Sequence, residues 1–199
     1  MTSALDGPAP TGLILSASAV QPVGGLFRPA APAIIVRRLG GPPKPPDTSA
    51  MQVDIHRQPL RVALDWQLDA VRLWREHPTF CPSFATRMAE AGLSRRQVVL
   101  FTKAAGDPLR FAYIGEPTRR FFGDAWADAQ LGRPHMDDGY SAFSLAIDAE
   151  YREAIAGGEP VHNRLVVHGL PGQPFIYTHT LLGWSLPSGR SVVVVLVDY

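Results

Sequence analysis

Residues 161–199 read VHNRLVVHGLPGQPFIYTHTLLGWSLPSGRSVVVVLVDY, and this stretch decides the fold. β-branched and aromatic residues dominate three runs, at 161–168, 175–184 and 191–199, which is typical of strands. The intervening GLPG at 169–172 and LPSG at 186–189 are rich in turn residues. Three antiparallel strands joined as a meander are therefore predicted for the C-terminal part of the chain.

A longer helix is predicted directly before this meander. Asp138 is placed to cap its N-terminus, and the glycine pair at 157–158 ends it. Its apolar residues recur at helical spacing and form one stripe. That stripe consists of Tyr140, Phe143, Ile147, Tyr151 and Ala154.

Two further strands are predicted upstream, at 98–102 and 109–114, with a turn at Asp107 and Pro108 between them. A short helix is expected to open at Glu116 and to close at Gly123. A loop containing Trp126 then leads to the LGR sequence at 131–133. The predicted order is two strands, short helical segments, a long helix and three strands.

Residues 51–96 are expected to form a helical N-terminal segment in front of a domain at 97–199. An amphipathic helix is predicted at 60–77, before Pro78, and a second helix at 83–91, before Gly92. The first helix would need a partner surface for its apolar stripe, which is either a second copy of the chain or the open face of its own sheet. The stripe consists of Leu60, Leu64, Leu68, Val71 and Trp74.

Residues 1–50 contain nine of the nineteen prolines and show little periodicity. Such a composition predicts a disordered Pro/Gly/Ala-rich leader. The PPKPP sequence at 42–46 leaves a docking role open beside a passive one. Translation from Met51 is a further alternative.

Composition excludes several classes of function. The 19 basic and 18 acidic residues give a net charge of +1, which provides no general attraction for nucleic acid or an anionic membrane. The single cysteine, Cys81, permits no disulfide within the chain, and the apolar run at 192–197 is too short to span a membrane. A cytoplasmic location is expected.

Two local motifs, within this order of elements, resemble the PAS family. The FAYIG sequence at 111–115 is similar to that family's second strand, and YREA at 151–154 with GEPV at 158–161 is similar to the junction of its long helix and third strand. The resemblance extends to small single-domain bacterial PAS-like proteins. It implies an α+β fold with a five-stranded antiparallel sheet, helices on one face and a small hydrophobic pocket between them.

The aromatic side chains expected to converge between helices and sheet, together with Ile147, are the candidate pocket residues, although such spacing is also typical of an ordinary core. They are Tyr113, Phe122, Trp126, Tyr140, Phe143 and Ile147.

No cofactor is expected in this pocket. Haem-binding relatives use a histidine on the long helix, which has none here, and flavin photoreceptors need a cysteine inside the domain, whereas Cys81 precedes it. The GWSLP sequence at 183–187 lacks the second glycine and the following helix of a nucleophile elbow, so no catalytic residues are assigned.

Histidines on two of the meander strands are the only metal-like cluster. If the turn pairs His168 with Phe175, then His162 and His168 share a face with His179, but Arg164 lies opposite His179 and no carboxylate joins the group. A metal site is therefore not expected.

These observations predict a non-enzymatic sensory or interaction module that binds a small molecule or a partner protein and acts in trans, as a homodimer or with a signalling partner. The alternative is a small enzyme or ligand carrier of the cone-shaped nuclear-transport-factor-like type. That fold normally places its long helices before most strands and uses an acid/base pair inside the cone. A dimerisation domain with a collapsed pocket is a third reading.

Overall fold

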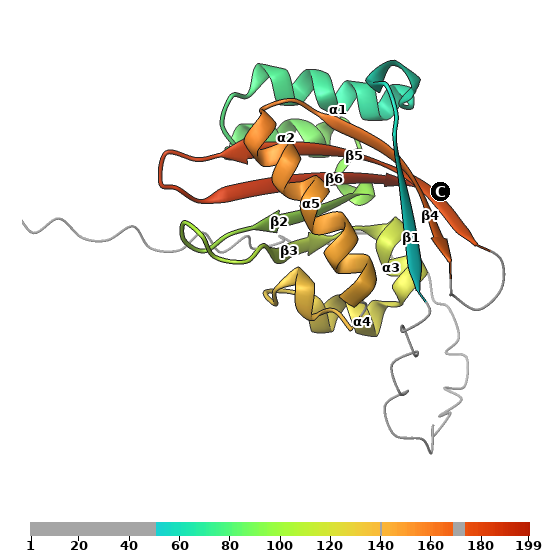
Figure 1. Cartoon of the computed structure of the whole chain (residues 1–199). Helices are drawn as coiled ribbons and strands as arrows, with labels where there is room; N and C mark the ends of the chain where they lie inside the picture. Colours follow the sequence, from blue (N-terminus) through green and yellow to red (C-terminus); the bar gives the residue numbers. More distant parts are fainter. Residues whose placement is uncertain (1–50, 140, 169–173) are drawn as a thin grey trace, which may run out of the picture. The chain divides into compact units, whose positions relative to one another are not determined.

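The computed structural model describes residues 51–139, 141–168 and 174–199. Within them the chain is an α+β protein with an antiparallel sheet of six strands in the order β1-β4-β5-β6-β2-β3 (Figure 1). The strands are β1 (Gln52–Arg57), β2 (Gln97–Phe101), β3 (Arg110–Ile114), β4 (Val161–His168), β5 (Phe175–Ser185) and β6 (Ser191–Asp198). The helices are α1 (Asp65–Glu76), α2 (Pro82–Glu90), α3 (Glu116–Phe122), α4 (Asp124–Gln130) and α5 (Ser141–Gly157).

The meander of β4, β5 and β6 is confirmed, and each strand pairs antiparallel with the next. The turn after β5 is closed by backbone hydrogen bonds from Leu186 to Arg190 and from Gly189 to Leu186. Gly189 has a φ of 76°, which favours glycine. The turn predicted at 169–172 and the leader predicted at 1–50 lie outside the described residues.

Strand β1 was not predicted, so the expectation of five strands is wrong. It pairs antiparallel with β4, from Gln52 opposite His168 to Arg57 opposite Asn163. Its inward residues are only partly buried, because β1 is an edge strand. In the sequence, only Val53 and Ile55 alternate with polar residues here, and two apolar residues are too few to predict a strand.

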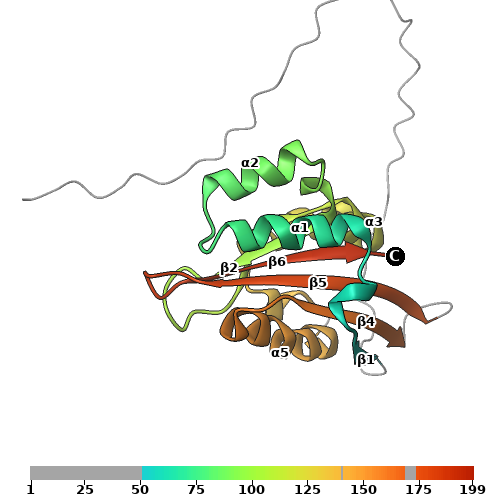
Figure 2. The same ribbon diagram turned by 90° about the horizontal axis from the view of Figure 1, so that it is seen from above.

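Both faces of the sheet are apolar, because β6 alternates two buried sets. Val193 and Val195 face α5, whereas Val192, Val194 and Leu196 face α1 and α2. Figure 2 shows α1 and α2 on one side of the sheet and α5 on the other. The expectation of helices on one face is therefore wrong, since a sheet buried on both faces needs cover on both.

The first amphipathic helix begins later than predicted. Leu60 lies in a 3₁₀ turn, and Leu64 occupies the N-cap position before α1 and is 43% exposed. Leu68 is only partly buried on α1. The buried face of the helix is instead formed by Gln67, Ala70, Val71 and Leu73.

Helices α1 and α2 pack on β5 and β6 through an aromatic cluster. Trp184 lies with its ring centroid 5.0 Å from that of Phe84 and 6.2 Å from that of Trp74. The indole of Trp74 donates to the Gly183 carbonyl at 3.1 Å, and that of Trp184 donates to the His77 carbonyl at 2.9 Å. Of the predicted partner-binding stripe, Val71, Trp74 and Leu60 thus contact this chain's own core.

On the other face, α5 crosses the sheet in direct contact with β5. A Cβ atom added to Gly183 would overlap the backbone carbonyl of Ala154. The absence of a side chain at Gly183 therefore sets the closest approach between helix and sheet. Larger side chains, such as Ile147 and Tyr151 of α5, occupy the core between the helix and the rest of the sheet.

A bulge in β3 changes the predicted facing of its residues. Val99 pairs with Tyr113 but Leu100 pairs with Phe111, so Ala112 is an extra residue. Phe111 and Ile114 consequently both enter the core, while Ala112 and Tyr113 are exposed. Strict alternation would have placed Tyr113 on the same face as Phe111.

Trp126 lies on helix α4 instead of in the predicted loop. Its indole donates to the Asp138 carbonyl at 3.2 Å and its ring stacks on Phe122 with centroids 4.4 Å apart. The Asp138 carboxylate accepts a 2.6 Å hydrogen bond from the Ser144 hydroxyl on α5. Helix α4 and the start of α5 are tied together by these contacts.

Candidate ligand-binding cavity

A cavity of about 70 Å³ lies between the sheet and helices α3, α4 and α5. Its walls are mainly apolar and aromatic, with a few polar groups. Those that carry the argument are Phe122, Trp126, Phe143, Ile147, Tyr151, Tyr177 and His179.

Four of the six predicted pocket residues line this cavity, namely Phe122, Trp126, Phe143 and Ile147. Tyr113 does not, because the bulge turns its side chain outward, where it is 41% exposed. Tyr140 lies outside the described residues.

Sequence reasoning did not assign Tyr151, Tyr177 or His179 to the pocket. Tyr151 was on the predicted apolar stripe of the long helix, so helical periodicity could have assigned it to the pocket. Tyr177 and His179 depend on the facing of β5, which periodicity alone does not fix.

The polar groups on α5 and the preceding turn lie at one side of the cavity. His135 is buried, with Nδ1 3.1 Å from the Leu109 carbonyl and Nε2 3.1 Å from Oδ1 of Asp148. Both ring nitrogens of His135 therefore face protein atoms. Only Nδ1 makes a hydrogen bond, because the 3.1 Å approach of Nε2 to Asp148 lacks hydrogen-bond geometry.

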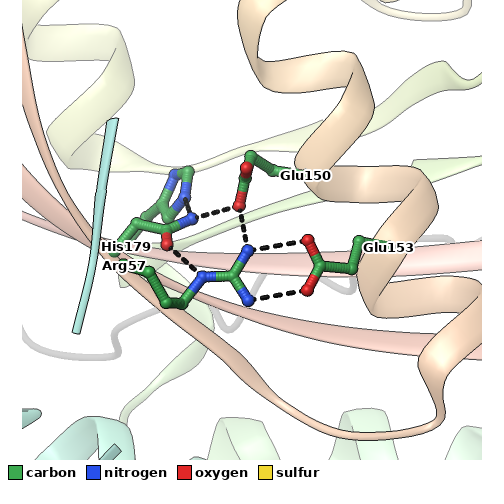
Figure 3. Close-up of polar contacts among 5 residues, drawn as sticks. Arg57, Glu150, Glu153 and His179 are labelled. Atoms are coloured by element: carbon green, nitrogen blue, oxygen red, sulfur yellow. Dashed lines mark hydrogen bonds and ion pairs between the residues drawn. The ribbon is translucent and has the colours of Figure 1, made fainter. Parts of the chain in front are cut away.

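A second polar group, drawn in Figure 3, joins the exposed Arg57 to His179, which lines the cavity. Arg57 on β1 donates to both oxygens of Glu153, at 2.7 and 2.8 Å, and to Glu150 at 2.7 Å. Its Nε donates to Oδ1 of Asn163 at 2.8 Å. The Asn163 amide nitrogen then reaches Glu150 at 2.7 Å and Nε2 of His179 at 2.9 Å.

This arrangement shifts the protonation of its members. Hydrogen bonds from Arg57 lower the pKa of Glu153. Burial, followed by the charges of His162 and Arg57, lowers the pKa of His179 from 6.5 to about 3. His179 is thus a neutral imidazole at physiological pH.

The three histidines of β4 and β5 lie apart. The register that would have brought them together, with His168 opposite Phe175, is wrong by one residue. Val167, not His168, pairs with Phe175, so His179 lies opposite Asn163. His162 is 2.9 Å from the Thr180 hydroxyl and His168 is 3.2 Å from Asp54. Among the described residues, no three His, Cys, Asp or Glu side chains are grouped to hold a metal ion.

No model of a known protein family matches the chain, and no curated protein matches its sequence. Over the part of the chain that the structure describes, no helix has the length and apolar character needed to cross a bilayer.

Proposed function

We propose that the protein is a non-enzymatic, PAS-like sensory or interaction module of the cytoplasm that binds a small molecule between α5 and the sheet and signals in trans. The single observation that carries this proposal is the cavity, which is lined by apolar and aromatic side chains and a few polar groups. The order of β2, β3, α3, α4, α5, β4, β5 and β6 supports the PAS-like part of the proposal.

The cone-shaped enzyme or carrier remains the second candidate, because His135 and Asp148 form a buried acid/base pair beside the cavity. One observation favours the sensory module. The long helix α5 lies between β3 and β4 instead of before most strands.

Signalling in trans requires a surface that responds to the cavity. Association as a homodimer through the region before and along α1 stays a prediction. Its apolar area is smaller than the sequence predicted, since Val71 and Trp74 pack within the chain while Val62 and Leu64 are 55% and 43% exposed. Sedimentation of the full chain at about 100 μM tests the dimer.

Filling the cavity tests the proposed function directly. Ile147→Phe adds volume to a residue that lines the cavity, and Leu145→Phe on the same helix is the matched control because Leu145 is 66% exposed. Protein from its native host is expected to release a small molecule on denaturation, detected by mass spectrometry. Wild type and Leu145→Phe should carry it and Ile147→Phe should not. Equal occupancy in Ile147→Phe, or no molecule in any preparation, contradicts the proposal.

A further inference from the structure

Two tyrosine hydroxyls border the cavity without a partner. Tyr151 on α5 and Tyr177 on β5 are 5% and 7% exposed, and both line the cavity. Over the described residues, neither hydroxyl makes a hydrogen bond to the protein. A buried tyrosine hydroxyl normally has a partner, so water or a ligand in the cavity is expected to supply one.

A third donor follows from the hydrogen bonds in Figure 3. Arg57 only donates, so the Asn163 atom that it contacts is the amide oxygen. The Asn163 nitrogen carries two hydrogens, of which one goes to Glu150 and the other to Nε2 of His179. Nε2 is therefore an acceptor, and the proton of the neutral ring is on Nδ1.

The Nδ1–H of His179 has no partner among the residues that the structure describes. His179 is itself 1% exposed and lines the cavity, and its ring centroid is 6.0 Å from that of Tyr177. The surface network thus fixes which proton His179 presents. Three donors border one small apolar space.

All three groups keep their protons at neutral pH. Burial, followed by the nearby carboxylates of Asp138 and Asp148, raises the pKa of Tyr151. Burial also raises the pKa of Tyr177 well above its ordinary value. A negatively charged ligand beside Tyr151 would be desolvated and repelled by the same two carboxylates.

We propose that the ligand is a compact, uncharged molecule with an apolar body and a carbonyl or equivalent acceptor oxygen. Its oxygen accepts from the Tyr151 and Tyr177 hydroxyls and from Nδ1 of His179, and its body contacts Phe122, Trp126 and Phe143. This inference rests on the proposed function, because it assigns the chemistry of the same cavity.

Calorimetric titration with three matched probes tests the ligand chemistry. Cyclopentanone has the acceptor oxygen, cyclopentane lacks it, and cyclopentanecarboxylate adds a negative charge. The ketone is expected to bind more tightly than the hydrocarbon, by about 2- to 12-fold for each hydrogen bond gained. The carboxylate is expected not to bind.

Single hydroxyl deletions assign the contacts. Tyr151→Phe and Tyr177→Phe should each weaken ketone binding by about 2- to 12-fold and leave cyclopentane binding unchanged. Tyr113→Phe is the matched control, because Tyr113 lies outside the cavity and should leave both affinities unchanged. A urea midpoint no lower than that of the wild type shows for each variant that the fold is retained.

The outcomes separate this inference from the proposed function. Equal affinities for ketone and hydrocarbon, unchanged ketone affinity in both Tyr→Phe variants, or preferred binding of the carboxylate would each overturn the ligand chemistry while leaving the cavity as a binding site. A native ligand that is lost in Ile147→Phe but carries no acceptor oxygen would also overturn the ligand chemistry and leave the cavity as a binding site. If no probe binds and no native ligand is found, both proposals fail.

Discussion

Both faces of the sheet are covered by helices, but the two faces are packed in different ways. On the face of α1 and α2, Phe84, Trp184 and Phe80 fill the centre with edge-to-face contacts, and two indole N–H groups reach backbone carbonyls. On the face of α5, aromatic rings surround a cavity that is bordered by the unpartnered Tyr151 and Tyr177.

The difference separates stability from binding. A filled aromatic cluster in which the Trp74 and Trp184 indoles are paired has little left to offer a ligand. Side chains that border a cavity lose dispersion contacts, and buried hydroxyls without partners lower the free energy of unfolding further. The packing of the α5 face is therefore less stabilising than that of the α1 and α2 face. Such a departure is expected where a protein binds something.

Truncating one phenylalanine on each face of the sheet should give the largest changes in unfolding free energy. Phe84→Ala removes a side chain that is 1% exposed and should lower the free energy of unfolding by about 3–5 kcal/mol. Phe143→Ala removes a half-buried side chain that already borders empty space, with an expected loss of about 1–2 kcal/mol. Urea denaturation measures both. Equal losses would show that the two faces are packed alike.

Gly183, which contacts elements on both faces, gives the next effect. Gly183→Ala forces the added Cβ against the Ala154 backbone and should cost about 1–3 kcal/mol of unfolding free energy. Gly157→Ala is the control, since its Cβ meets nothing within 4 Å. That variant should be neutral or slightly stabilising by thermal denaturation. A neutral Gly183→Ala would mean that α5 is not seated on the sheet as described.

The buried histidine of the cavity face should make stability depend on pH. The unfolded chain protonates His179 as the pH falls through 6.5, whereas the folded protein resists until a pKa of about 3. The unfolded state therefore binds more protons in this window, and stability should fall on acidification by up to about 1.4 kcal/mol per pH unit.

Urea denaturation at pH values from 7.5 to 5 measures this dependence. His179→Gln should reduce the slope without abolishing it, because burial also lowers the pKa of His162. Identical slopes in the variant and the wild type would contradict the assignment of His179 as a buried neutral ring.

The surface end of the same network should give the smallest effect. Glu153→Gln weakens a bidentate contact with Arg57 between side chains that are 54% and 45% exposed, so about 0.2–1 kcal/mol of unfolding free energy is expected, and less at high salt. Glu90→Gln is the control, because Glu90 lies 3.9 Å from Arg87 in a looser exposed pair. If Glu153→Gln loses no more unfolding free energy than Glu90→Gln, the contact between Arg57 and Glu153 does not stabilise the fold.

Local periodicity predicted most elements of the sheet and the long helix. The runs that became β4, β5, β6 and α5 carry their signal within about ten to twenty residues, and four of the six candidate pocket residues followed from it. The short helix α4 was missed, since one turn or two with a single large aromatic residue, Trp126, gives little period to detect.

The rest depends on contacts between distant segments. Arg57 and Glu153 are 96 positions apart in the sequence, and no local sequence pattern predicts their contact. The facing of His179 depends on whether Val167 or His168 pairs with Phe175, and a shift of one residue reverses it. The bulge at Ala112 reversed Tyr113 in the same way.

The packing of α1 and α2 on β5 and β6 also has a consequence for synthesis on the ribosome. The apolar faces of both helices are complete at Glu90, but the strand that covers them ends only at Asp198. At about 5–20 residues per second, roughly 5 to 20 s separate the two events. During that interval the Phe84 and Trp74 side chains have no native surface to cover them. Chaperones that hold nascent chains are expected to contact this segment first.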